Sequence, residues 1–275
     1  MSPIDILLSL DMGTEDCLYR LRRDLPSTST VLYVHLLTLS LIPTDSLTYG
    51  PDLIRDLRRT IPDWDNGTWT TLTVSREDGA VKAVRDEWAP HFLRADAITS
   101  ELPRINVLDL EVIASLKNRV SRVRLPGQPR TRILKICPFA YQLRYLAREM
   151  RAYEVLWERR CRLVPQVEAY IFERSEEQVM GFLCEKVEGR FAGPGDYGEC
   201  RAAVEKLHEF GVVHGDLNRY NIIIEGGRVR FVDLEKAVLD TEVEGGEFAR
   251  LCEEELEGLE KMLNDKEGWG KPWGG

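Results

Sequence analysis

Three side chains with oxygen atoms suited to bind a metal lie close together in the last third of the chain. Asp216 and Asn221 belong to the loop 214–221, five positions apart (221 − 216), and Asp233 follows 17 positions after Asp216 (233 − 216). Carboxylate and carboxamide oxygens are the hard ligands that Mg²⁺ accepts, and a free carboxylate can orient an attacking hydroxyl. This inventory is what phosphoryl transfer from ATP requires.

The segments around the loop explain how these residues come together. Residues 201–210 have helical spacing and end at Gly211, which predicts a helix leading into the loop. Two apolar runs, 222–224 and 229–232, flank a Gly-Gly pair and predict a β-hairpin that brings the second aspartate back to the asparagine. In the alternative interpretation the loop is an ordinary surface loop, in which the aspartate and asparagine only cap turns.

A lysine and a glutamate upstream fit the same chemistry. Residues 131–136 read as a strand that carries Lys135, and the apolar spacing of 141–159 predicts an amphipathic helix. Glu149 lies on this helix, 14 positions after Lys135 (149 − 135). An ion pair between the two would fix a flexible ammonium beside bound phosphates. The alternatives are an edge-strand lysine reaching into water and one more solvated glutamate.

Together these segments resemble the protein-kinase-like superfamily over about residues 105–240. The nearest resemblance is to the aminoglycoside phosphotransferase and choline kinase branch and to small atypical kinases, including short fungal kinase-like proteins. Gly215 stands where typical protein kinases have Arg, and Asn218 where they usually have Lys. The second metal motif reads Asp233-Leu234-Glu235 in place of Asp-Phe-Gly.

The resemblance implies ATP and Mg²⁺ as cofactors and gives each residue a role. Asp216 would be the catalytic base, Asn221 and Asp233 the metal ligands, and Lys135 with Glu149 the phosphate clamp. Two further strands, at 163–172 and 179–187, lead into a segment similar to the hinge between kinase lobes. The backbone of this hinge would hold adenine through Glu185, Lys186 and Val187.

Two departures from the superfamily pattern stand out. The hairpin expected at 110–125 contains no glycine, so phosphate binding there would depend on Lys117, Asn118 and Arg119. No Ala-Pro-Glu follows the second motif, and only 40 residues (275 − 235) remain. They provide one helix, 247–264, whose Glu253-Glu254-Glu255 run is expected on the solvated face.

Composition narrows the class of protein. A net charge of −9 disfavours binding to nucleic acid or to an anionic membrane. The six cysteines show no zinc-finger spacing, and a disulfide framework is not expected in a chain this long. The apolar run 31–42 is too short to span a bilayer, and the start of the chain lacks a signal-peptide pattern. We expect a cytoplasmic protein, with a nuclear location left open.

The first hundred residues are less informative. Segment 18–23 suggests a helix, and 31–41 is a buried strand or helix that periodicity does not resolve. A helix at 51–60 has Pro in its first turn, and a hairpin is expected from 68 to 88 around Asp78-Gly79. Trp64, Trp69 and Trp88 are expected to form a small aromatic core, with a binding face as the alternative.

We therefore predict an α+β, two-lobed protein-kinase-like fold with a β-rich N-lobe and a reduced helical C-lobe. Residues 1–104 would be an extension with a β-hairpin packed on the N-lobe, and the kinase-like domain would comprise the N-lobe 105–184, hinge 185–189 and C-lobe 190–275. The predicted function is Mg-ATP-dependent phosphotransfer to a hydroxyl of a protein or small molecule. The alternative is a pseudokinase that serves as a nucleotide-binding or scaffolding module. The acceptor and the oligomeric state are left open.

Overall fold

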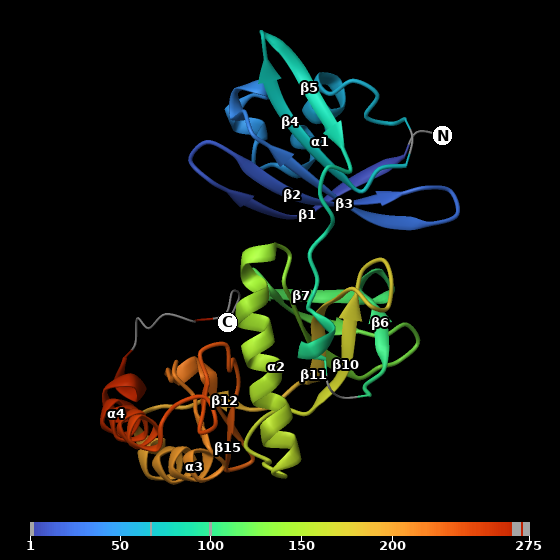
Figure 1. The fold of residues 1–275 in the computed structure, drawn as a ribbon. Coiled ribbons are helices and arrows are strands. Elements are labelled where there is room, and N and C mark those ends of the chain that lie inside the picture. The colour runs from blue at the N-terminus through green and yellow to red at the C-terminus, as the bar shows by residue number, and fades with distance from the viewer. Residues whose placement is uncertain (1–2, 67, 99–100, 266–270, 272–275) are drawn as a thin grey trace.

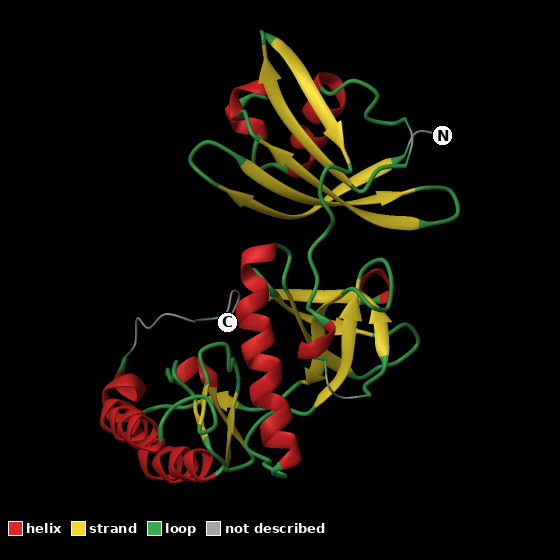
Figure 2. Ribbon diagram, viewed as in Figure 1, coloured by secondary structure: helices red, strands yellow, loops and turns green. Residues whose placement is uncertain are grey.

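The computed structural model describes residues 3–66, 68–98, 101–265 and 271. Its N-terminal part is a five-stranded sheet of order β1-β2-β3-β4-β5 with helices on one side (Figures 1 and 2). All neighbouring strands are antiparallel except β3 and β4, between which the chain crosses over through α1. The elements are β1 (Ile4–Met12), β2 (Cys17–Asp24), β3 (Ser29–Leu36), α1 (Gly50–Thr60), β4 (Thr71–Glu77) and β5 (Ala80–Arg85).

The expectation of a helix at 18–23 is wrong, because these residues form most of β2. The residues on one face of this strand, Cys17, Tyr19 and Leu21, are fully buried in the N-terminal core, while Arg20 is buried on the opposite face. The polar–apolar alternation that marks a half-buried strand covers only residues 19–22, because the apolar Leu18 lies on the less buried face and the charged Arg23 is buried on the core face. Segment 31–41, for which the sequence left a strand or a helix open, is a strand as far as Leu36.

The predicted helix and hairpin of the N-terminal part are confirmed, and the predicted aromatic core is confirmed for two of its three tryptophans. The helix at 51–60 is present with Pro in its first turn. Asp78 and Gly79 have φ of 49° and 81°, the left-handed pair that a two-residue type I′ hairpin turn requires. Trp64 and Trp69 are buried with ring centroids 5.4 Å apart, whereas Trp88 packs edge-to-face on Tyr33 outside that core.

A second sheet of order β6-β10-β11-β9-β8-β7 forms the N-lobe. The long helix α2 runs alongside it and down toward the C-terminal part (Figure 1). One face of the sheet buries Val123, Leu134, Ile171 and Leu183, and the other joins the larger core shared with α2. The elements are β6 (Arg104–Asn106), β7 (Glu111–Lys117), β8 (Val120–Arg124), β9 (Thr131–Ile136), α2 (Leu143–Glu158), β10 (Val167–Phe172) and β11 (Val179–Glu185).

The C-lobe is small and contains two longer helices in the described residues. Its two short sheets have orders β12-β14-β15 and β13-β16. The elements are β12 (Arg190–Phe191), α3 (Tyr197–Glu209), β13 (Val212–Val213), β14 (Ile222–Glu225), β15 (Arg228–Phe231), β16 (Val238–Leu239) and α4 (Gly245–Asn264). This arrangement confirms the predicted α+β, two-lobed kinase-like fold with a reduced helical C-lobe. In the described part of the chain, no helix combines the length and apolarity that crossing a membrane would need.

Buried polar contacts join the N-terminal sheet to the N-lobe. Arg20 of β2 forms an ion pair with Glu173, at the end of β10, and Tyr33 donates a hydrogen bond to the same carboxylate at 2.5 Å. All three residues are less than 8% exposed. The connecting segment adds a hydrogen bond of 2.6 Å between His91 Nε2 and the carbonyl of Cys137, just after β9. A buried charge pair of this kind holds the two parts in one arrangement.

Candidate active site

The loop between β13 and β14 is shaped by hydrogen bonds within itself. The Asn218 side chain accepts the amide of Tyr220 at 2.9 Å and so caps the 3₁₀ turn Arg219–Asn221. Asn218 and Asn221 both donate through Nδ2 to the carbonyl of Asp216, at 3.2 and 3.0 Å. The loop therefore has a fixed shape, and the Asp216 carboxylate is left free of this network.

The predicted hairpin is present and brings Asp233 back to the loop. Gly226 and Gly227 of its turn have φ of 55° and 83°. Just after β15, the amide of Val232 donates to the carbonyl of Asn221 at 3.0 Å. The carbonyl of Val232 is hydrogen-bonded to Nε2 of the fully buried His214 at 3.0 Å. These two bonds fix the residue before Asp233 to both ends of the loop.

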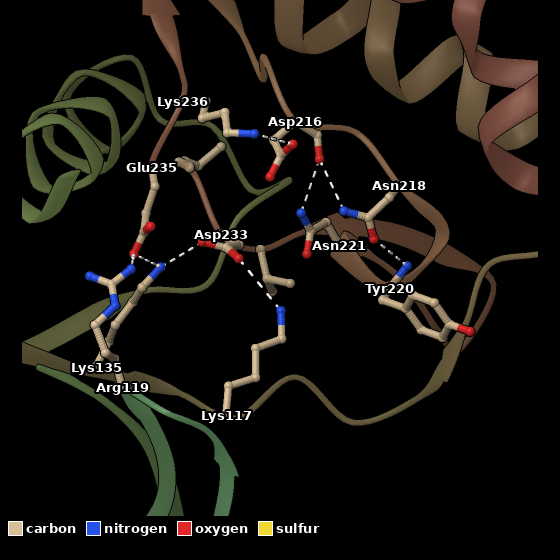
Figure 3. Close-up of polar contacts among 12 residues, drawn as sticks. Lys117, Arg119, Lys135, Asp216, Asn218, Tyr220, Asn221, Asp233, Glu235 and Lys236 are labelled. Atoms are coloured by element: carbon tan, nitrogen blue, oxygen red, sulfur yellow. Dashed lines mark hydrogen bonds and ion pairs between the residues drawn. The ribbon is translucent and has the colours of Figure 1, made fainter. Parts of the chain in front are cut away.

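Asp216, Asn221 and Asp233 surround one open space, with Lys117 entering from the opposite side (Figure 3). The space is a cavity of about 460 Å³. Its lining comprises Lys117, Asp216, Leu217, Asn218, Arg219, Asn221, Asp233, Lys236, Met262 and Asp265. Asn221 is 1% exposed, and its Oδ1 has no hydrogen-bond partner among the described residues. A buried carboxamide oxygen without a hydrogen-bond partner lowers the stability of the fold unless a ligand supplies that partner.

Lys135 and Glu149 form the predicted ion pair. Lys135 Nζ lies 2.7 Å from Glu149 Oε2, 2.6 Å from Asp233 Oδ1 and 2.8 Å from Glu235 Oε1. The lysine is 6% exposed and the glutamate 1%. The second oxygen of Glu149 accepts the amide of Leu234 at 3.1 Å. Helix α2 thereby holds both the strand lysine and the backbone next to Asp233.

The charges of this cluster depend on one another. Burial raises the pKa of the Glu149 carboxyl, and the neighbouring Lys135 opposes that shift. Burial alone would raise the pKa of Asp233, but Lys135 and Lys117 bring it below its ordinary value. The pKa of Lys135 is raised by its three carboxylate neighbours against the opposing effect of burial. Three carboxyl groups therefore surround one ammonium, which occupies the place where these oxygens would otherwise gather round a metal.

Asp233 has a φ of 68°, in the left-handed region that residues with a side chain seldom occupy. Aspartate tolerates this conformation better than most residues. Its ion pair with Lys135 and the bond from the next amide to Glu149 hold it there. Strained backbone of this kind is often found at functional sites.

The glycine-free hairpin β7–β8 reaches the site with two cations. Its strands are joined at Asn118 and Arg119. Lys117 Nζ lies 3.6 Å from Asp233 Oδ2 and lines the cavity, while Arg119 forms an ion pair with Glu235. Side-chain cations, rather than closely approaching glycine amides, therefore face the position expected for phosphates.

The expectation that Glu253-Glu254-Glu255 lies on a solvated face is wrong for Glu255. Glu255 is 7% exposed and accepts the amides of His214 and Gly215 at 3.1 and 2.8 Å. Its Oε2 is also 2.8 Å from Nε2 of His208. Burial alone would raise its pKa, but the two histidines and these amides lower it. Helix α4 thus holds the start of the loop 214–221 through one buried carboxylate.

The predicted hinge residues lie at the end of β11, outside the lining of the 460 Å³ cavity. Glu185 donates its amide to the carbonyl of Gln166 at 3.0 Å, and its carboxylate pairs with Arg230. Lys186 pairs with Glu188 at 2.7 Å, and Val187 is buried. Adenine binding at Glu185, Lys186 and Val187 stays a prediction. A larger, mainly apolar cavity of about 690 Å³ adjoins Glu185 but includes none of the predicted catalytic or metal-binding side chains.

Sequence reasoning missed the roles of three charged residues. Glu235 contacts Lys135, Lys236 contacts Asp216, and Glu255 holds the loop. For Glu255 the signal was present, since it precedes Leu259 and Leu263 at intervals of four, and these three are the buried residues of α4. For Glu235 the signal was its place in the motif Asp233-Leu234-Glu235, and for Lys236 it was only a position three residues after Asp233.

Comparison with known families agrees with the site. Residues 195–251 match the family model "RIO1: RIO domain", which describes atypical kinases within the protein-kinase-like superfamily. The matched segment covers the loop, the hairpin β14–β15 and the segment through Asp233. No curated protein matches the chain. The match spans 57 of the 275 residues (251 − 195 + 1) and agrees with the predicted superfamily resemblance in that segment, while the narrower resemblance to aminoglycoside phosphotransferases and choline kinases stays a prediction.

Proposed function

We propose that this protein is a Mg-ATP-dependent phosphotransferase that moves the γ-phosphoryl group to a hydroxyl. The observation that carries the proposal is the convergence of Asp216, Asn221 and Asp233 on one cavity opposite Lys117, with the Lys135 ammonium bound to Asp233. Residues that are 17 positions apart meet there through a loop and a hairpin that the family match also covers. Phosphoryl transfer depends chiefly on such positioning and on charge stabilisation.

The side chains fit a hard divalent cation. The unpartnered Oδ1 of Asn221 and the Asp233 carboxylate are oxygen donors that line the same cavity. Asp233 Oδ2 is the less engaged of its two oxygens, since its lysine neighbour is 3.6 Å away. Asn221 and Asp233 would hold the ion. A bound Mg²⁺ would neutralise charge on the nucleotide phosphates.

The other charged residues at the cavity have separate roles in the transfer. Asp216 accepts the proton of the acceptor hydroxyl while the oxygen of that hydroxyl bonds to the γ-phosphorus. The bond from that phosphorus to the β–γ bridging oxygen breaks, and the electron pair leaves with ADP. Lys135, held by Glu149, supplies positive charge to the phosphates, and Lys117 adds a second cation on the hairpin side. The Asp216 carboxylate is suited to its part because its side chain is 41% exposed at the cavity.

The acceptor would be a small molecule or an unusual protein segment, found in the cytoplasm. Among the described residues, the chain passes from Asp233 through the two-residue strand β16 to the single helix α4. Among these residues, β16 and α4 lie beside the loop, and a small acceptor needs only the cavity itself.

A pseudokinase remains the second candidate because one observation favours it. Lys135 is bound by Asp233 and Glu235 as well as by Glu149, so its ammonium is already fully engaged. The hairpin above it also lacks glycine. A nucleotide would have to compete with these carboxylates for the lysine, and such a protein would serve as a binding module.

Nucleotide binding and turnover separate the two candidates. The melting temperature would be measured with ATP, with ATP and Mg²⁺, and with EDTA, together with release of labelled phosphate from [γ-³²P]ATP. We expect stabilisation that requires Mg²⁺ and slow turnover, both lost in Asp233→Ala. Asp45→Ala, an exposed change in the N-terminal part, is the control. Retained turnover in folded Asp233→Ala would refute the metal role, and stabilisation without any turnover would favour the pseudokinase.

A further inference from the structure

The catalytic loop does not itself supply a cation beside the Asp216 carboxylate. Between Asp216 and Asn221 its one basic residue is Arg219, whose guanidinium lies against the ring of Tyr220, 5.6 Å from the centroid. Asn218, which lines the cavity, uses its side chain to cap the turn and to bind the Asp216 carbonyl. Arg219 lines the same cavity but forms no ion pair with Asp216 among the described residues, so the cation at that carboxylate comes from another segment.

Lys236 brings a cation to this position. Its Nζ lies 2.8 Å from Asp216 Oδ1, and the side chain lines the cavity with Asn221 and Asp233 (Figure 3). The side chain is 57% exposed, so its ammonium remains hydrated and can contact a ligand as well as the aspartate. The hydrogen bond to Asp216 is the first cause of the raised pKa of Lys236, which keeps the amine charged.

The backbone around Lys236 is built to hold it against the loop. Gly215 has a φ of 75°, and a Cβ at that position would lie 2.2 Å from the carbonyl oxygen of Lys236. Only a residue without a side chain permits this approach. Leu234 and Ala237 on either side are buried, and the amide of Ala237 donates to the carbonyl of Leu234 at 3.1 Å. The position of Lys236 is thus set by packing and by the glycine next to the catalytic aspartate.

We infer that Lys236 is a further catalytic residue, which contacts the transferring phosphoryl group and orients Asp216. The inference rests on the proposed phosphotransfer. As the γ-phosphorus passes from the bridging oxygen of ATP to the acceptor oxygen, negative charge on its equatorial oxygens meets the ammonium of Lys236. The same ammonium holds one oxygen of Asp216, so that the other faces the proton of the acceptor. Lys117 and Lys236 would then flank the phosphoryl group from the two lobes.

The test compares Lys236→Gln with Lys206→Gln, a lysine on α3 that is equally exposed (55%) and also paired with a carboxylate. Intrinsic turnover of Mg-ATP with water as acceptor would be followed as labelled inorganic phosphate. We expect kcat to fall about 100-fold in Lys236→Gln, the loss typical of one preorganised charge-stabilising group, with KM for ATP changed less than about threefold. Lys206→Gln should match the wild type. Melting curves with and without Mg-ATP establish that each variant folds and binds.

Two further variants separate charge from structure. Lys236→Arg should retain kcat within about tenfold, because it keeps the charge. Lys236→Met, which removes the charge and offers no amide, should be as impaired as Lys236→Gln. The inference is overturned if Lys236→Gln turns over like the wild type, or if Lys236→Arg is as impaired as Lys236→Gln. A wild-type protein that releases no phosphate refutes the proposed function itself, and Lys236 loses its role with it.

Discussion

The two halves of the candidate site hold their charges in different ways. On the N-lobe side, Lys135 and Glu149 are buried. Carboxylates surround the lysine, so the charge of each group depends on its partners. On the loop side, Asp216 and Lys236 form a pair that is roughly half exposed, with side chains 41% and 57% accessible. Water can replace either partner there. A substitution in the buried half should therefore change both the free energy of unfolding and phosphotransfer, whereas one in the exposed half should change phosphotransfer alone.

The main chain of the two halves also differs, but in the opposite sense to the exposure of their side chains. The exposed pair stands on the more firmly bonded main chain, because Glu255 accepts two consecutive amides at the start of the loop and the two asparagines bind its middle. The buried cluster includes the strained residue Asp233. A precise but accessible base therefore requires a rigid loop, whereas a buried charge cluster can hold an unfavourable backbone conformation in place.

Lys135→Met should give the largest effect, because it leaves three carboxylates with one cation fewer. We expect loss of phosphotransfer and a decrease of about 3–5 kcal/mol in the free energy of unfolding, measured in urea at pH 7. Burial already raises the pKa of Glu149, and without the lysine that pKa rises further. A group with a raised pKa in the folded state binds its proton more readily when folded, so the deficit should shrink as pH falls. A deficit below about 1 kcal/mol would contradict the coupling.

Asp216→Asn tests the exposed half. Removing a general base typically lowers turnover by about 10²–10⁴-fold, while the loss of one half-exposed ion pair changes stability by less than about 1 kcal/mol. Turnover of [γ-³²P]ATP and urea unfolding would be measured on the same preparation. A large loss of stability would show that the exposed half is not separable. The exposed change Asp45→Ala is again the matched control.

Glu255→Gln tests the support of the loop. The carboxylate of Glu255 accepts hydrogen bonds through two oxygens, whereas a glutamine side chain has one accepting oxygen. The NH₂ group of the glutamine would face a group that also donates. We expect a loss of about 1–3 kcal/mol in stability and reduced turnover. The pKa of Glu255 is lowered in the folded protein, so its contribution is present above its ordinary value of 4.5 and lost as pH falls below it.

That pH dependence provides the control. Wild type and Glu255→Gln should converge in stability on acidification, followed by urea unfolding between pH 6 and the lowest pH at which both remain soluble. The exposed neighbour Glu253→Gln should behave like the wild type throughout. A constant difference at every pH would mean that the carboxylate charge is not what holds the loop.

Lys117→Gln should have the smallest effect. The side chain is 31% exposed and lies 3.6 Å from Asp233, so its loss should change stability by less than about 0.5 kcal/mol. We expect KM for ATP to rise about tenfold, equivalent to roughly 1.4 kcal/mol of phosphate binding, in steady-state assays at low salt. Lys82→Gln, on a surface hairpin of the N-terminal part, should leave KM unchanged. An unchanged KM in Lys117→Gln would show that the glycine-free hairpin does not bind phosphate.

Local pattern predicted the elements that present the site. The Gly-Gly turn, the spacing of 201–210 and the strand around Lys135 predicted a helix, a hairpin and a strand that are all present. These succeeded because the apolar periodicity and turn chemistry of each segment are decided within a few neighbouring residues. The helix expected at 18–23 failed because the strand alternation covers only residues 19–22. Arg23 is buried on the core face through its ion pair with Asp5, a contact that only the tertiary structure provides.

The sequence by itself determined which residue types can bind metal, accept a proton and pair across the lobes, because Asp216, Asn221, Asp233, Lys135 and Glu149 are fixed by motif and spacing. Only the tertiary structure decided which of the remaining charges join them. Glu255 and Lys236 look like solvated residues along the chain, and Glu235 is marked only by its place in the motif that begins at Asp233. They become site residues because α4 and the segment after Asp233 pack against the loop and Lys135. The physical reason is that burial and partner distance set the energy of a charge, and both arise from long-range packing.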